Sequence, residues 1–125
     1  MSFMTIGLVL ASVMASAIAQ LLLKTGMSRP DVVAAIAEGR AASTALTLGT
    51  TPEVVGGLGL YGFGAVMWLF VLAKLDLSAA YPFVGLGFIA TMLLSIFVLG
   101  ETVSPGRIAG TLLILAGCAL VARSL

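Results

Sequence analysis

A polar stripe runs along the first apolar segment of the chain. Four polar residues recur at four-residue intervals in an otherwise apolar sequence: Ser12, Ser16, Gln20 and Lys24. Side chains four residues apart lie above one another on a helix, so hydroxyl and amide groups would form a track that ends in a cation. Such a track predicts a lined path for a ligand headgroup. The alternatives are serine hydroxyls that bond back to carbonyls four residues earlier and a glutamine that bonds a neighbouring helix.

Three charged side chains stand beside the apolar segments. Lys24 closes the first segment, while Glu101 and Arg107 flank the start of the last. In a chain that crosses a membrane four times, all three would lie at one face, together with the free N–H groups that begin the last helix. Cations and helix N-termini favour anions, so this face is predicted to hold a phosphate. Alternatively, the two cations meet lipid headgroups and Glu101 pairs with one of them.

An aromatic residue precedes a proline near the start of the third apolar segment. Tyr81-Pro82 is followed by Gly85 and Gly87, a combination that permits a kink and a close backbone approach. Tyr81 is a candidate substrate contact opposite the polar stripe, or else an anchor at the membrane surface. The predicted substrate-binding residues are therefore Ser12, Ser16, Gln20, Lys24, Tyr81, Glu101 and Arg107.

The composition excludes several kinds of chemistry. The chain has no histidine and a single cysteine, Cys118, so neither a disulfide nor a Cys/His metal site is expected. A net charge of +1 removes the electrostatic basis for binding nucleic acid. Every carboxylate lies at or beyond the end of an apolar segment, whereas proton antiport needs a titratable group inside the bilayer. We therefore expect no enzyme, catalytic residue, metal or cofactor, and no carboxylate-based proton antiport.

The elements that position these residues are predicted to be four transmembrane helices. The 125 residues are 61% hydrophobic and 9% charged, against about 25% charged in soluble domains. Charges delimit four apolar runs, most of them near the roughly 20 residues that a helix needs to cross the hydrocarbon core. The sequence predicts an all-α integral membrane protein: one transporter domain over residues 1–125, with spans at about 3–24, 53–73, 78–99 and 104–123.

The first connection differs in composition from the others. Within residues 24–53, Ser28 and Pro30 begin a predicted short helix at the membrane surface; the alternative is a flexible, Ala-rich loop. The other connections are short, so sequential helices are expected to be antiparallel neighbours. Cations are more frequent at the first and third connections than at the opposite face: Lys24, Arg29, Arg40 and Arg107 against Lys74 and Arg123. This weak bias places those connections in the cytoplasm and leaves dual insertion open.

Small residues recur on the predicted helix surfaces. A ridge on the first span consists of Gly7, Ala11, Ala15 and Ala19, and further candidates are Gly56, Gly57, Gly59, Gly62, Gly64, Gly110 and Gly117. Small residues let helix backbones approach closely where no hydrophobic effect drives association. We expect these surfaces to pack helices within the chain and between subunits.

The order of several motifs resembles that of the four-helix, EamA-type members of the drug/metabolite transporter superfamily. The motifs are Ala19-Gln20-Leu21 with Lys24, Trp68-Leu69-Phe70-Val71-Leu72, Ala79-Ala80-Tyr81-Pro82, Glu101-Thr102-Val103-Ser104-Pro105, and Gly110 with Gly117. Within that group the chain resembles the aminoarabinose-phosphoundecaprenol flippase subunits, over about residues 5–27 and 58–122.

This resemblance implies a function and a setting. A polyprenyl-phosphate-linked sugar or similar anionic lipid would be flipped across a bacterial inner membrane, by a homodimer or a heterodimer with a similar small membrane protein. Related small multidrug resistance transporters use a glutamate in the first helix, and alignment on Lys24 places Ser16 there, which again disfavours proton antiport. The segment from 28 to 51 resembles neither group.

Two other functions stay open. One is a small-molecule or drug exporter of the small multidrug resistance type, with Trp68 and Tyr81 as aromatic contacts for a cation. The other is a non-transporting membrane subunit that joins a larger complex through its glycine-rich faces.

Overall fold

The protein is almost entirely helical. A computed structural model describes residues 2–124, and within that range it contains no strand. The elements in chain order are α1 (Phe3–Met27), α2 (Pro30–Glu38), α3 (Ala41–Thr50), α4 (Pro52–Lys74), α5 (Leu77–Ala80), the 3₁₀ turn η1 (Tyr81–Val84), α6 (Gly85–Phe97) and α7 (Pro105–Arg123). Four segments of the described chain are long and apolar enough to cross a membrane: α1, α4, the third span (Leu77–Phe97) and α7. The predicted all-α membrane fold is confirmed.

Local sequence signals set where the helices begin. The Ser2 hydroxyl accepts a hydrogen bond from the Thr5 N–H at the start of α1, and Ser104 does the same for Arg107 at the start of α7. Proline occupies the first turn of α2, α4 and α7, where its missing N–H has no helical partner to lose. Thr51 precedes α4 without capping it, because its hydroxyl donates to the Thr47 carbonyl oxygen at 2.7 Å.

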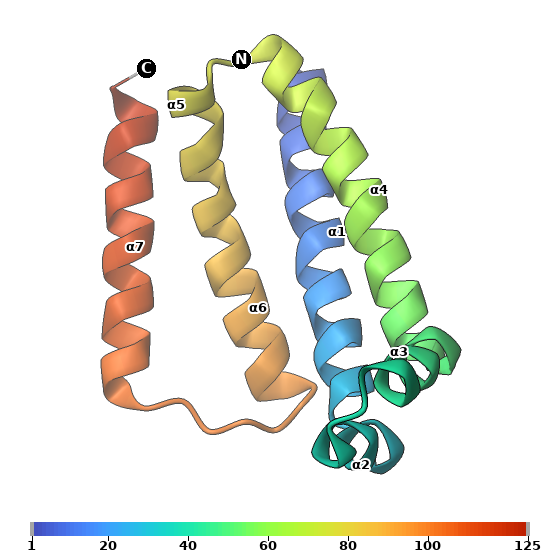
Figure 1. Cartoon of the computed structure of the whole chain (residues 1–125). Coiled ribbons are helices and arrows are strands. Elements are labelled where there is room, and N and C mark those ends of the chain that lie inside the picture. Colours follow the sequence, from blue (N-terminus) through green and yellow to red (C-terminus); the bar gives the residue numbers. More distant parts are fainter. Residues whose placement is uncertain (1, 125) are drawn as a thin grey trace.

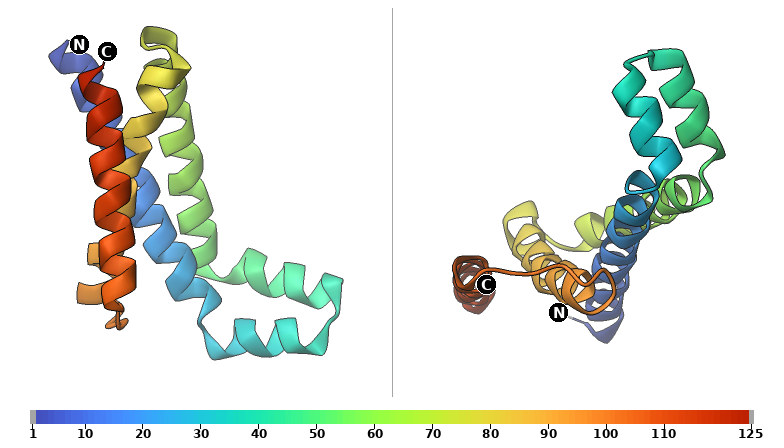
Figure 2. Two further views of the ribbon diagram at one scale, coloured as in Figure 1. Left: turned by 90° about the vertical axis from the view of Figure 1, so that its left-hand side faces the viewer. Right: turned by 90° about the horizontal axis from the view of Figure 1, so that it is seen from below.

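The spanning helices stand in a row. α4 packs along α1, the third span lies against α1 through α6, and α7 stands beyond α6 (Figures 1 and 2). The chain reverses direction at each crossing, so the start of α1 and the end of α7 lie on the same side of the bundle, at the top of Figure 1. The first and second spans are antiparallel neighbours, as are the third and fourth. The third span makes its main contact with α1 rather than with α4.

Small residues make the contact between α1 and α4 close. A Cβ atom added at Gly57 would lie 3.2 Å from the Ala19 carbonyl oxygen, and one at Gly64 would lie 3.3 Å from the Ala15 Cβ. Ser12 joins the same two helices, since its buried hydroxyl donates to the Gly64 carbonyl oxygen at 2.9 Å. We call this contact the α1–α4 seam.

Other small residues do not pack within the described chain. A Cβ atom would meet nothing within 4 Å at six spanning-helix glycines: Gly7, Gly56, Gly59, Gly62, Gly110 and Gly117. The ridge predicted on the first span therefore packs at Ala15 and Ala19, whereas Gly7 and Ala11 are exposed. Glycine was predicted to mark packing surfaces, and within the chain this holds on α4 for the two glycines that face α1.

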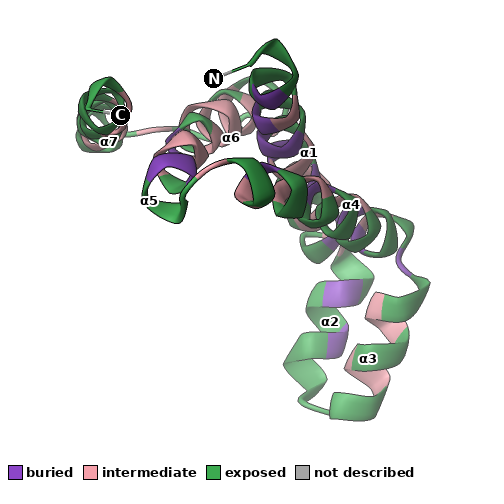
Figure 3. Cartoon of the chain, turned by 90° about the horizontal axis from the view of Figure 1, so that it is seen from above, coloured by how far each residue is buried: buried purple, intermediate pink, exposed green. Residues whose placement is uncertain are grey.

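The fourth spanning helix is the least packed. No described residue of α7 is buried (Figure 3), and its contacts run to α6 and η1. Large apolar side chains such as Leu113 are exposed along its length. A surface of this kind is suited to contact with lipid or with another protein, because exposing so much apolar area to water would be unfavourable.

The third span changes helix type where proline interrupts it. At Tyr81–Val84 the chain forms a 3₁₀ turn containing Pro82, and α-helix resumes at Gly85. Proline lacks the N–H that an α-helical bond needs, which favours such an adjustment. Gly85 is buried against α7, and a Cβ atom there would collide with the Cys118 sulfur. This close approach fixes α7 against the third span at one point.

The first connection is a helical hairpin and not a flexible loop. α2 begins at Pro30 as predicted, and α3 is a second helix that the sequence analysis missed. The hairpin projects sideways from the ends of α1 and α4 (Figure 2, left). The Thr44 hydroxyl donates to the Ala35 carbonyl oxygen at 3.2 Å, joining the two helices. An ion pair of 2.9 Å between Arg29 and Glu53 joins the hairpin's base to α4.

The α1–α4 seam predicts that substitution of two adjacent glycines will differ in its effect on stability. Gly57→Leu should lower stability by about 1–3 kcal/mol, because the new side chain meets Leu23 and the α1 backbone. Gly56→Leu is the matched control, since its Cβ meets nothing within 4 Å. Thermal unfolding of both variants in detergent measures the difference, and equal midpoints would contradict the seam.

Candidate functional site

Three aromatic side chains border a pocket near the middle of α1 and α4. This pocket, called here the aromatic pocket, has a volume of 240 Å³ and lies where α1, α4 and the η1–α6 region meet. Its lining residues are Ser12, Val13, Ser16, Tyr61, Gly64, Ala65, Trp68, Tyr81, Val84 and Gly87. None of them carries a formal charge. The pocket offers aromatic faces and hydroxyl groups to a neutral polar ligand.

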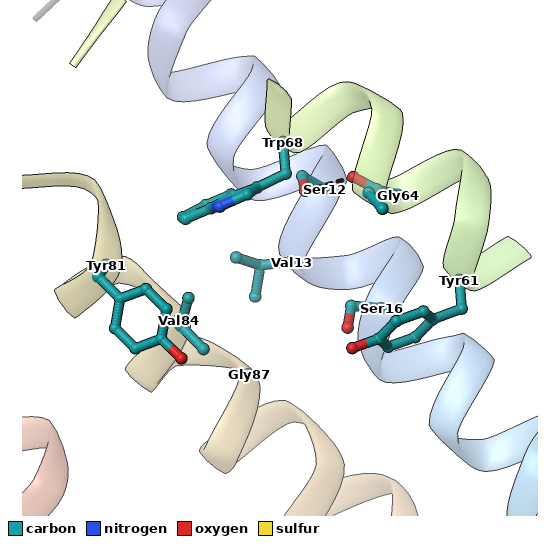
Figure 4. Close-up of a pocket in the computed structure, with 10 residues that line it drawn as sticks. Ser12, Val13, Ser16, Tyr61, Gly64, Trp68, Tyr81, Val84 and Gly87 are labelled. Carbon is teal, nitrogen blue, oxygen red and sulfur yellow. Dashed lines mark hydrogen bonds between the residues drawn. The ribbon is translucent and has the colours of Figure 1, made fainter. Parts of the chain in front are cut away.

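The two serines of the polar stripe play different parts in this pocket. Ser12 is committed to the α1–α4 seam through its bond to the Gly64 carbonyl oxygen, so it does not bond back along its own helix. Ser16 is half-buried and faces the pocket, with the Tyr61 hydroxyl beside it in Figure 4. Trp68 and Tyr81 border the pocket from different helices (Figure 4). Ser16 is therefore the stripe's hydroxyl best placed to meet a ligand.

The lower half of the stripe lines a second pocket, called here the Lys24 pocket. It has a volume of 330 Å³ and lies between α1 and α6, at the end where the 98–104 loop passes. Its lining residues are Ala17, Gln20, Leu21, Lys24, Thr91, Leu94, Ser95, Leu99 and Glu101. Gln20 and Lys24 of the polar stripe thus line the same pocket as Glu101. Both Gln20 and Lys24 are exposed.

Arg107 lines a third pocket, between α6 and α7, called here the Arg107 pocket. Its volume is 470 Å³, and it shares Thr91, Ser95 and Glu101 with the Lys24 pocket. Lys24 and Arg107 therefore lie in adjoining pockets and do not line the same one. A ligand phosphate could reach either cation, with Glu101 standing between them.

The alternative of a Glu101 ion pair is not what the structure contains. Within residues 2–124 two ion pairs occur, and both belong to Arg29, which contacts Glu53 at 2.9 Å and Asp31 at 3.3 Å. The hydrogen bond to Glu53 raises the pKa of the Arg29 guanidinium above its usual value. Lys24 and Arg107 are thus free to bind an anion. They lie on the side of the bundle where the 98–104 loop passes, called here the loop end. One N–H at the start of α7, that of Arg107, is already bonded to Ser104 at 3.3 Å.

Sequence reasoning missed several of the lining residues. Tyr61, Thr91 and Ser95 were not singled out, and Trp68 entered as part of a family motif and as a contact in the exporter alternative. Thr91 and Ser95 stand four residues apart in an apolar segment, the same signal that marked Ser12 and Ser16. Their hydroxyls donate to the Gly87 and Met92 carbonyl oxygens, both at 2.8 Å, so each keeps acceptor capacity toward a ligand.

Several curated proteins with similar sequences share a name. The chain is 41% identical over 63 residues to the "Probable 4-amino-4-deoxy-L-arabinose-phosphoundecaprenol flippase subunit ArnE" of Pseudomonas aeruginosa strain PAO1, covering 50% of this chain and 55% of that protein. It is 39% identical over 62 residues to the protein of the same name from Pseudomonas fluorescens strain Pf0-1, covering 50% and 54%. No family model and no solved structure matches the chain.

These similarities extend over part of each protein. The chain spans about half the length of the curated relatives it matches. Their names describe subunits of a flippase and not enzymes. The resemblance to aminoarabinose-phosphoundecaprenol flippase subunits, predicted from the order of the motifs, is confirmed by this similarity.

Proposed function

We propose that the protein flips a polyprenyl-phosphate-linked sugar, or a similar anionic lipid, across a bacterial inner membrane. The observation that carries this proposal is the succession of pockets: an uncharged aromatic pocket near mid-membrane, then the Lys24 and Arg107 pockets at the loop end. The names of the relatives supply the substrate class. Residues 1–125 act as one four-helix unit in this proposal.

The phosphate is held at the loop end. Of the cations on the spanning helices, Lys24 and Arg107 lie at the loop end. Each lines a pocket to which α6 contributes hydroxyl groups. A phosphate between them replaces its hydration with charge-assisted bonds, which are stronger than neutral ones. Glu101 lines both pockets. Its negative charge repels an anion held there, which weakens binding and so favours release.

The sugar moves through the uncharged part of the row. Gln20 lines the Lys24 pocket and lies one helical turn from Ser16, which lines the aromatic pocket, so amide and hydroxyl groups follow one another along α1. Trp68, Tyr61 and Tyr81 supply aromatic faces, which pack well against the carbon–hydrogen side of a pyranose ring and attract an ammonium group. Polar side chains along the path lower the cost of carrying hydroxyl groups through hydrocarbon.

Transport does not use a carboxylate inside the bilayer in this mechanism. Glu53 lies in the first turn of α4 and pairs with Arg29, while Glu101 lies in the loop before α7. Ser16, which occupies the position of the glutamate in small multidrug resistance transporters, lines the aromatic pocket. A hydroxyl there binds a neutral group and exchanges no proton near neutral pH.

A second subunit completes the translocation path. The row of helices is open, and the glycines of α4 that face away from α1 leave space beside them, as at Gly59 and Gly62. Small residues of this kind let a second helix approach. We propose a homodimer, or a heterodimer with a similar small membrane protein, joined through that face.

Removing a cation should slow translocation without unfolding the protein. Lys24→Ala is expected to reduce flipping of a fluorescent polyprenyl-phosphate sugar in proteoliposomes about tenfold, through the loss of one charge-assisted bond. Lys74→Ala is the matched control. Lys74 ends α4 on the side of the bundle away from the 98–104 loop, and its ammonium group contacts the Met4 sulfur. Equal rates for the two variants would remove Lys24 from the site. Faster movement of a soluble cationic dye than of the lipid would favour the exporter instead.

Alanine variants of Ser12 and Ser16 should distinguish a role in helix packing from a role in ligand binding. Ser12→Ala should lower stability by about 0.6 kcal/mol, the average for a hydrogen bond between membrane helices, since it removes the bond to the Gly64 carbonyl. Ser16→Ala should leave the thermal midpoint unchanged and slow flipping, because this hydroxyl faces the pocket. Normal flipping by Ser16→Ala would exclude the aromatic pocket from the path.

A further inference from the structure

The seam between the third span and α7 is hollow along most of its length. Beyond the Arg107 pocket lies a further one of 600 Å³, toward the chain termini, and the two share Phe88 and Ile114. We call the joined pair the α6–α7 groove. Its α7 side falls on one helical face, at three- and four-residue spacing: Arg107, Gly110, Thr111, Ile114, Gly117, Cys118 and Val121.

The groove changes from polar to apolar along the membrane normal. At the loop end it holds Arg107, Glu101 and the hydroxyl groups of α6. Toward the termini it is bordered mainly by apolar side chains, among them Phe88, Ile114 and Val121. Arg107 has no carboxylate oxygen within 4.0 Å in the described part of the chain. A charged end and an apolar body match an amphipathic lipid with an anionic head.

We propose that the α6–α7 groove holds the hydrocarbon chain of a polyprenyl phosphate, with the phosphate at Arg107. This inference rests on the proposed function, which supplies the polyprenyl phosphate. From Arg107 to Val121 the helix rises roughly 21 Å, a large part of the hydrocarbon core of about 30 Å. Moving the hydrocarbon chain from lipid into an apolar groove brings no hydrophobic gain. Its binding would therefore be stabilised by van der Waals packing against the groove walls.

The place of the groove links chain binding to headgroup transfer. Thr91, Ser95 and Glu101 line both the Arg107 pocket and the Lys24 pocket. A phosphate at Arg107 therefore stands next to the start of the polar path while its chain stays beside α7. The lipid can keep its tail in the groove as the head enters between α1 and α6.

A second helix does not suit the same space. α7 and the third span touch at Gly85 and Cys118, which both also line the groove. An α-helix with its side chains is about 10–12 Å across, and inserting one would force this contact apart. One flexible chain can follow the walls without separating the helices.

Cys118 reports occupancy of the groove without added mutations, because it is the chain's single cysteine and lines the apolar part. In detergent-solubilised protein, undecaprenyl phosphate should slow N-ethylmaleimide labelling of Cys118 at least about fivefold. Undecaprenol, which lacks the phosphate, and inorganic phosphate, which lacks the chain, should each protect much less. No protection by undecaprenyl phosphate, or equal protection by phosphatidylglycerol, would overturn the proposal. An oxidant-induced Cys118 disulfide between two copies would also overturn it, by placing a second copy there.

A pair of variants tests the groove by filling it. Gly117→Phe should abolish the protection of Cys118 and slow flipping, because its side chain enters the groove, where a Cβ atom meets nothing within 4 Å. Gly7→Phe is the control, with equally open space on α1 outside the groove. Size-exclusion chromatography and helical circular dichroism establish that both variants fold.

The two proposals fail in different ways. Protection of Cys118 by undecaprenyl phosphate in a protein that flips no lipid would overturn the proposed function and support the groove. Normal flipping by Gly117→Phe, with no protection of Cys118 in the unmodified protein, would overturn the groove and leave the function standing.

Discussion

Close approach of backbones at the α1–α4 seam is the constraint on which the rest of the structure depends. In lipid, apolar side chains gain nothing by leaving their surroundings, so helices associate through packing and interhelical hydrogen bonds. Gly57 and Gly64 let α4 lie against Ala19 and Ala15, and Ser12 adds a bond to the Gly64 carbonyl. Were a larger residue present at either glycine, α4 would move outward. The walls of the aromatic pocket, to which both helices contribute, would move with it.

Packing weakens along the row, and the pockets follow that gradient. Buried residues concentrate on α1 and α4, whereas α7 has none in its described range (Figure 3). The aromatic pocket lies against the well-packed helices, where side-chain positions are held by neighbours. The Arg107 pocket and the groove beyond it lie against α7, which touches the third span closely at Gly85 and Cys118. Rigid walls suit recognition of a headgroup, while a loosely held helix suits a hydrocarbon chain that must enter from the bilayer.

The charges lie where a membrane tolerates them. Lys24, Glu101 and Arg107 line adjoining pockets at the loop end, and the ion pair of Arg29 with Glu53 lies at the same end. Charges cost little free energy at an interface and much more at the bilayer centre. The proposed path therefore presents an anion with cations at one face and with hydroxyl, amide and aromatic groups inside. An electrostatic difference of this kind can select a lipid head by its charge without a titrating residue.

The four spanning helices and the start of α2 at Pro30 followed from the sequence, because apolar length and helix-start signals are local properties. Ser12, Ser16 and Tyr81 line one pocket, and the four-residue spacing of the two serines places them on one face of α1. The helix α3 was missed because its stretch of Ala, Thr and Leu residues carries no start signal. Thr91 and Ser95 carry the four-residue spacing that marked Ser12 and Ser16 but were overlooked, whereas no local signal marks Tyr61 as a pocket residue.

The tertiary structure decided which helix lies beside which. Spacing along one helix says which residues share a face, but not what that face meets. In lipid the partner is chosen by shape, as when Gly57 and Gly64 turn to α1 while Gly59 and Gly62 stay open. The same choice commits Ser12 to packing, leaves Ser16 in the pocket, and places Lys24 and Arg107 in adjoining pockets. Residue types and their order determined the helices and the end of each that carries charge. Contacts between residues far apart in the chain depend on how well whole helix surfaces fit together, and this fit is defined only in the folded molecule.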